Sequence, residues 1–238
     1  MDRPPTYEPQ VLPAIDTTVV SRELRTRIWP LLELKGFTEF RARTAWRDVP
    51  GQVLVVNVEP FNTYMADRLG CTPCSFTVNL GIFFLAIPQY LPVKKLRSGT
   101  FLPTEYQCHF RKHLLKTRGV DFFPRRDIWY VDNASEMLAG AIDDVVTRLA
   151  TDGFDWFEHF SSERNVLHTL RHDEESDEGT FGFGIPVSPM RNLQTGYIAL
   201  SQGRHGLAVE RLSQALESGC FDHIGKRLRA DIASAANS

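Results

Sequence analysis

The side chains of this 238-residue sequence that are best suited to hold a ligand are cationic and recur at every second position. Arg41 and Arg43 alternate with Phe40 and other uncharged residues, and His109 and Arg111 alternate in the same way further along. Successive side chains of a strand point to opposite faces, so each pair should share one face of a sheet. Arginine and histidine there can hold a carboxylate or a phosphate through charge-assisted hydrogen bonds. The predicted binding residues are Arg41, Arg43, Asn79, His109 and Arg111.

Acidic side chains occupy the same segments and allow other interpretations. Glu39 or Glu105 could neutralise the cations within the chain, which would make the face structural. Glu39, Glu59 and Glu105 could also meet near strand ends as a site for a hard metal ion, although surface carboxylates are far commoner. The face could equally be an ordinary solvated sheet surface.

A cysteine and histidine set is the second candidate for chemistry. Cys71 and Cys74 have zinc-knuckle spacing, and Cys108 with His113 could complete four ligands. An extended strand would separate Cys108 from His113 by about 16 Å, and Cys108 alternates with aromatic residues like a core thiol. We therefore predict no metal and no cofactor.

Motifs for catalysis are absent from the sequence. It contains no GxSxG elbow, and the glycines at 179, 182 and 184 do not form a dinucleotide-binding loop. We predict no catalytic residues and favour a non-enzymatic protein.

The elements that must position these residues follow from periodicity. Helical spacing runs from Thr17 to Lys35, with Pro30 expected to kink it or set its last turn apart. Alternating or apolar runs predict strands at residues 37–46, 52–59, 75–87, 105–111 and 127–132, with a turn at 48–51. Later, helices are predicted at residues 135–152, capped by Ser135 and closed by Gly153, at 154–171, on either side of Gly203, and from Phe221 onward.

Strands in one run followed by helices in another predict an α+β fold. We expect an antiparallel sheet of about five strands, helices on one of its faces and a C-terminal helical hairpin. Residues 1–187 should form the core domain, beginning with an irregular arm at 1–15, and residues 188–238 a helical extension packed on that core.

Charge and hydropathy limit the classes of protein. The net charge of −2 argues against binding of nucleic acid through the overall charge of the protein, although a local basic patch can still bind it. The longest apolar stretch, Ile82 to Ile87, is too short to span a membrane, and the first residues do not resemble a secretory signal. Four cysteines fit reduced thiols, so we expect a cytoplasmic protein.

Four segments resemble a known bacterial family, catalogued as domain of unknown function 4304. They are SFTVNLGIFF (75–84), TEYQCHFR (104–111), DIWYVD (127–132) and GFDWFEHF (153–160), and the resemblance covers about residues 18–170. The family supplies no activity and no catalytic residues to carry over. By analogy alone, the resemblance implies an accessory or interaction protein in a conflict or immunity system.

We therefore expect a protein that recognises another protein through its polar sheet face or its C-terminal helices. The alternative is an enzyme or binding protein that acts on a phosphate-bearing ligand or nucleic acid at the basic sheet face. A membrane partner is not expected.

Overall fold

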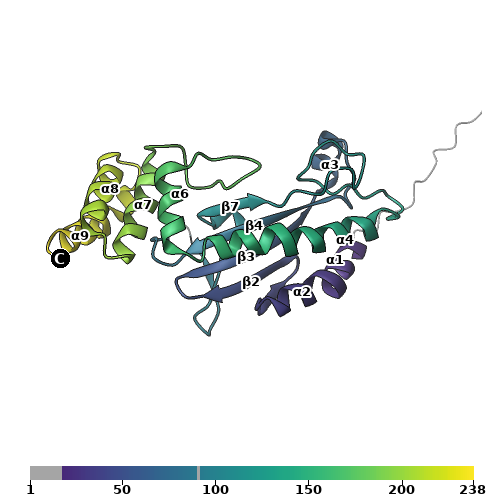
Figure 1. Cartoon of the computed structure of the whole chain (residues 1–238), viewed down its shortest axis with the longest axis horizontal. Helices are drawn as coiled ribbons and strands as arrows, with labels where there is room; N and C mark the ends of the chain where they lie inside the picture. The colour runs from purple at the N-terminus through teal and green to yellow at the C-terminus, as the bar shows by residue number, and fades with distance from the viewer. Residues whose placement is uncertain (1–17, 90–91) are drawn as a thin grey trace, which may run out of the picture.

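The computed structural model describes residues 18–89 and 92–238. The arm predicted at residues 1–15 lies outside the described residues. Within them, the chain builds one five-stranded antiparallel sheet, a small two-stranded sheet, and helices at both ends of the sequence (Figure 1). The α+β prediction is confirmed.

The main sheet has the order β1-β2-β3-β4-β7. Its strands are β1 (Glu39–Arg41), β2 (Thr44–Val49), β3 (Gln52–Pro60), β4 (Phe76–Phe84) and β7 (Phe110–His113). Pro50 and Gly51 join β2 to β3, and Gly51 takes the left-handed conformation (φ 77°) that a tight turn requires. The small sheet pairs β5 (Lys94–Lys95) with β6 (Phe101–Leu102).

Helices cover one face of the main sheet (Figure 1). At the N-terminal side these are α1 (Thr18–Glu23), a π-helical turn (Leu24–Ile28) and α2 (Trp29–Leu34). Pro30 lies in the first turn of α2, where its missing N–H costs nothing, and the wider turn precedes it. The regular α-helical geometry is therefore interrupted just before Pro30, while the kink predicted for this helix stays a prediction.

A long helical segment crosses the same face. It consists of α4 (Leu138–Arg148), a π-helical turn (Leu149–Gly153) and α5 (Phe154–His159). The predicted stripe of α4 faces the core, and Ile142 is completely buried. The predicted ends were wrong. At the start, Ser135 has φ 62° and makes no cap. At the other end, the helical backbone continues through Gly153, which packs so closely on the sheet that an added Cβ would lie 3.5 Å from Leu80.

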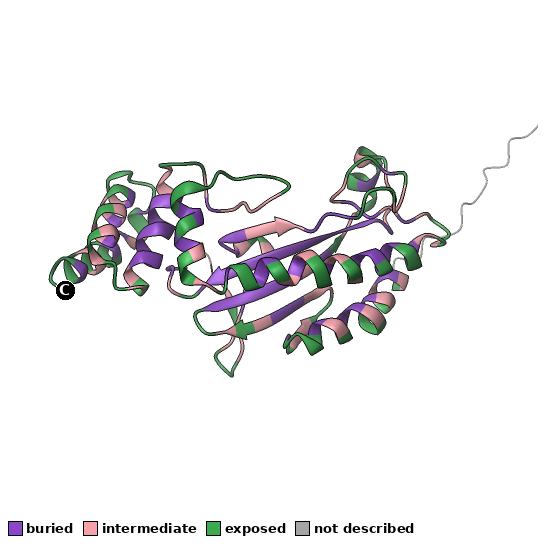
Figure 2. Cartoon of the chain, viewed as in Figure 1, coloured by how far each residue is buried: buried purple, intermediate pink, exposed green. Residues whose placement is uncertain are grey.

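The remaining helices are α3 (Thr63–Leu69), α6 (Glu163–His172), α7 (Pro189–Ser201), α8 (His205–Glu217) and α9 (Gly225–Ala236). The last three extend the molecule beyond one end of the sheet, where α7 and α8 form the predicted hairpin around Gly203 (Figure 1). Buried residues of these helices, such as Leu193 and Leu212, belong to the same hydrophobic cluster as the sheet. Figure 2 shows buried stretches both in these helices and in the strands of the sheet. The domain boundary at residue 188 stays a prediction.

Three predicted strands were wrong, each for a local reason. Residues 37–46 are two strands, because Ala42 (φ 50°) and Arg43 form a tight turn that pairs Arg41 with Thr44. Residues 105–107 form a short 3₁₀ helix, which a capping box between Thr104 and Gln107 stabilises, and β7 starts only at Phe110. Residues 127–132 contribute a single bridge, between Trp129 and Phe76.

Candidate functional site

The sheet face that the helices leave free is partly covered by residues 92–107. At one end of the sheet, Leu102 and Phe101 of this segment pack on Val53, Val55 and Phe83. At the other end the face carries polar side chains from all five strands. Strand pairing aligns Asn57 with Thr44 and Asn79, and aligns Asn79 with His113.

A hollow of about 500 Å³ opens between this polar end and the covering segment. We call it the sheet-face hollow. It is lined by Arg41, Thr44, Trp46, Asn57, Glu59, Pro92, Lys94, Leu102, Thr104, Glu105, Tyr106 and Gln107. The buried Trp46 donates its indole N–H to the carbonyl of Pro103 at 2.7 Å, which ties the covering segment to the sheet.

Asn79 organises the floor beside this hollow. Its side chain is buried and donates to Glu59 Oε2 at 3.4 Å, while its Oδ1 lies 2.8 Å from Nδ1 of His113. An amide oxygen can only accept, so this contact is a hydrogen bond in the tautomer that carries its proton on Nδ1. Burial lowers the pKa of His113, which favours this neutral ring.

Glu105 faces Arg111 on the same face. Glu105 Oε1 lies 4.0 Å from Arg111 Nε, and both side chains are largely buried. Burial raises the pKa of Glu105, the charge of Arg111 lowers it, and the charge of Glu59 raises it further. The interpretation in which Glu105 neutralises a cation within the chain therefore applies to Arg111.

Arg43 does not join this face, which corrects the prediction for that residue. It lies in the turn between β1 and β2, and its Nε donates to Ser21 Oγ of α1 at 3.0 Å. Burial lowers its pKa. The turn at Ala42 interrupts the two-residue period that would have placed Arg43 beside Arg41.

The prediction that His109 lies on the open polar face was also wrong. It is buried between Phe83 and Phe84, and its Nδ1 accepts from the backbone N–H of Phe84 at 3.0 Å. Burial lowers the pKa of His109 to about 3, so the ring is neutral and cannot attract an anion. Of the five predicted residues, Arg41, Asn79 and Arg111 lie on the open face of the sheet. Arg41 stands on β1 and Arg111 on β7, which are the two edge strands, so the structure does not bring these two cations together. Only Arg41 lines the sheet-face hollow.

The cysteines do not assemble a metal site. Cys74 belongs to the cluster on the helical face, whereas Cys108 belongs to the cluster on the opposite face, so the sheet separates them. Among residues 18–89 and 92–238, no group of three or more His, Cys, Asp or Glu could hold a metal ion. Glu39 makes no ion pair with any described residue, and only Glu59 and Glu105 of the acidic trio line the sheet-face hollow.

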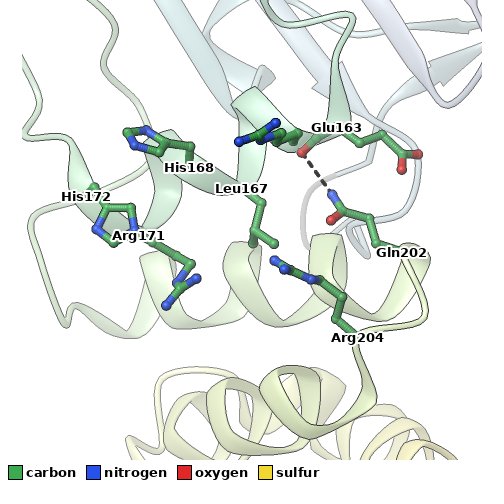
Figure 3. A pocket seen from close by; sticks show the side chains of 8 residues that line it. Glu163, Leu167, His168, Arg171, His172, Gln202 and Arg204 are labelled. Atoms are coloured by element: carbon green, nitrogen blue, oxygen red, sulfur yellow. Dashed lines mark hydrogen bonds between the residues drawn. The ribbon is translucent and has the colours of Figure 1, made fainter.

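The strand-based prediction missed a second feature, a basic groove beside α6 (Figure 3). We call it the α6 groove, and it is lined by Glu163, Arg164, Leu167, His168, Arg171, His172, Gln202 and Arg204. Its cations on α6 recur at helical spacing, opposite buried Val166 and Leu170. That periodicity was available in the sequence, but Arg204 comes from the turn after α7 and only the fold brings it there.

Fold and site together define an α+β protein with a polar hollow on the open face of its sheet. The family model described as Domain of unknown function (DUF4304) matches residues 28–159, so the chain belongs to this family, as the sequence resemblance predicted. The match includes every residue that lines the sheet-face hollow and ends before α6. No curated protein and no solved structure matches the chain. No helix in the described part of the chain has the length and apolarity of a membrane span.

Proposed function

We propose that this protein is a non-enzymatic binding protein that recognises a segment of another protein in the sheet-face hollow. The observation that carries the proposal is the mixed charge of the lining. Arg41 and Lys94 are exposed beside exposed Glu59 and largely buried Glu105. A phosphate-rich ligand would meet two carboxylates there, whereas a peptide presents donors, acceptors and side chains of both signs.

Residue types at the hollow support a protein partner. Tyr106 lines it with 67 % of its surface exposed, and Arg41 faces it from the edge strand. Tyrosine and arginine dominate the binding energy of protein interfaces, because each combines a large contact area with directed hydrogen bonds. Tyr106 stands on the 3₁₀ helix that the Thr104–Gln107 capping box holds in place.

Rigid support of the polar groups is a second argument. Asn79 hydrogen-bonds Glu59, and Gln107 Nε2 donates to the carbonyl of Pro92 at 3.0 Å. A lining fixed before binding loses less conformational entropy when a partner arrives. The setting that we expect, a bacterial conflict or immunity system, follows from the family resemblance and stays a prediction. The cytoplasmic location follows from the four cysteines and the first residues, and it also stays a prediction.

A photo-cross-linking amino acid at position 106 tests the proposal in the native cell. The matched control carries it at Tyr64, which has nearly the same exposure (64 %) on α3, away from the hollow. We expect one protein to be cross-linked from position 106 but not from 64, and the adduct to disappear when Arg41→Glu is added. Equal adducts from both positions, or an adduct at 106 that Arg41→Glu does not change, would contradict the proposal.

A further inference from the structure

The α6 groove has a predominantly basic lining, whereas the lining of the sheet-face hollow carries charges of both signs. It is an open hollow of about 480 Å³ between α6 and the turn that joins α7 to α8. In Figure 3, Arg171 of α6 and Arg204 of the turn extend to either side of Leu167. Gln202 Nε2 donates to the carbonyl of Glu163 at 3.0 Å, which fixes the turn against the start of α6.

Five exposed cationic or imidazole side chains meet one acidic residue in this groove. They are Arg164, His168, Arg171, His172 and Arg204. Among the described residues, no hydrogen bond or ion pair engages the guanidinium groups of Arg164, Arg171 and Arg204. Cations gathered without counter-charges repel one another, and a bound anion would remove that cost.

The acidic loop after α6 does not neutralise the groove. Asp173 accepts a hydrogen bond from Thr169 Oγ1 at 2.6 Å and reaches only His168 of the groove, at 3.8 Å. Glu175 accepts from the backbone N–H groups of Gly182 and Gly184, and Glu178 pairs with Arg126. The other two acids of the loop act on cations outside the groove, Glu174 on Arg191 and Asp177 on His113. Among the described residues, no carboxylate of this loop forms an ion pair with an arginine of the groove, so the arginines stay available to a ligand.

Helix stability does not account for all of these cations. Arg171 and His172 lie in the last turn of α6, where positive charge favours the helix dipole. Arg164 lies in the first turn, where positive charge opposes the dipole. Its place in the groove therefore needs another reason, and contact with an anion supplies one.

We propose that the α6 groove binds the phosphodiester backbone of single-stranded nucleic acid. Arg164 and Arg171 lie seven residues apart on one helix face, which is about 10.5 Å along the axis. This row of charges suits successive phosphates of a chain better than one phosphate at a point.

The imidazole rings favour a nucleic acid over an acidic peptide. His168 and His172 are exposed, with ring centroids 4.9 Å apart. Imidazole and guanidinium planes can stack on bases, and such stacking accepts every base. The site should therefore bind single strands with little preference for sequence. This inference does not depend on the sheet-face hollow.

The experiment measures binding of a fluorescent oligouridylate of about 12 nucleotides to the full chain over a range of salt concentrations. If three arginines each neutralise one phosphate, log K against log salt should have a slope of about −2. Arg164→Ala, Arg171→Ala and Arg204→Ala should each reduce the magnitude of the slope by about 0.7. Arg229→Ala removes the same charge from an exposed position on α9 and should leave the slope unchanged.

Three results would overturn the proposal. They are no binding by the wild-type chain at low salt, the same slope for the groove variants as for Arg229→Ala, and equally good competition by polyglutamate of equal charge. The last would identify a site for acidic peptides. All the substituted residues are exposed, so an unchanged melting temperature should show that each variant is folded.

Discussion

Oε1 of Glu105 lies 4.0 Å from Nε of Arg111 on the open face of the sheet, and only 12 % of the Glu105 side chain is exposed. Burial raises the pKa of Glu105 despite the nearby guanidinium. A pKa that is higher in the folded than in the unfolded chain adds stability at low pH, and this contribution disappears as the pH rises through the folded value. The ionised carboxylate therefore destabilises the fold at neutral pH.

Glu105→Gln should accordingly raise the urea midpoint of unfolding at pH 7. The gain should disappear when the pH falls below the ordinary pKa of a glutamic acid, about 4.3. Glu217→Gln, at an exposed position of α8, serves as the control and should change the midpoint little. A lower midpoint for Glu105→Gln at pH 7 would show that the ion pair with Arg111 outweighs burial.

His109 should make the fold sensitive to acid. Its pKa falls to about 3 because it is buried, so the unfolded chain takes up a proton at this ring before the folded chain does. The resulting stability is complete above the ordinary histidine value, about 6.5, and declines by about 1.4 kcal/mol per pH unit below it.

The free energy of unfolding measured at pH 7, 6 and 5 should therefore fall more steeply for the wild type than for His109→Asn. The amide oxygen of asparagine can still accept a hydrogen bond but does not titrate. Parallel pH profiles for the two proteins would contradict the burial of a neutral ring at this position.

Gly81 lets Cys108 pack directly on β4. A Cβ at residue 81 would lie 2.6 Å from Cys108 Sγ and 2.9 Å from its Cβ. Gly81→Ala should destabilise the fold by about 1–3 kcal/mol, the usual cost of overpacking a core. Adding Cys108→Gly should recover part of that loss, and a double-mutant cycle by urea unfolding measures the coupling. Additive effects would mean that Cys108 does not cover Gly81.

Gly196 and Gly206 should respond to alanine with opposite signs. A Cβ on Gly196 of α7 would lie 2.6 Å from Leu212 Cγ and 3.1 Å from the Leu212 backbone nitrogen of α8. Gly206 of α8 has no atom within 4 Å of its added Cβ. Gly196→Ala should cost about 1–3 kcal/mol, whereas Gly206→Ala should stabilise by up to about 1 kcal/mol. Equal effects would contradict the close approach of α7 and α8.

Sequence periodicity predicted the layers of the fold. It failed where a few residues determine the local backbone conformation. The stripe of α4 and the buried strands β3 and β4 followed from patterns that extend over many residues. The tight turn at Ala42 and the 3₁₀ helix after Thr104 depend on the local backbone geometry. The residues there alternate between polar and apolar types as in a strand, although they do not form one. Arg43 therefore lies in a turn, and His109 precedes β7 and is buried between Phe83 and Phe84, so neither residue occupies the place that the two-residue period predicted.

The site itself required tertiary information. The strands could place Arg41, Asn79 and Arg111 on one face, because each lies on a strand of the sheet. The pairing of Arg111 with Glu105 depends on how residues 92–107 fold back over the sheet, which no short-range pattern records. The α6 groove is similar, since its arginines come together only when α7 packs beside α6.

The affinity of the cross-linked partner for three purified chains tests the central proposal most directly. The chains are the wild type, Tyr106→Ala at the sheet-face hollow, and Tyr64→Ala at a comparably exposed tyrosine on α3. If the hollow recognises the partner, Tyr106→Ala should weaken binding by about tenfold or more, with the melting temperature unchanged, and Tyr64→Ala should bind like the wild type. Equal dissociation constants for all three chains would contradict recognition of another protein at the sheet-face hollow.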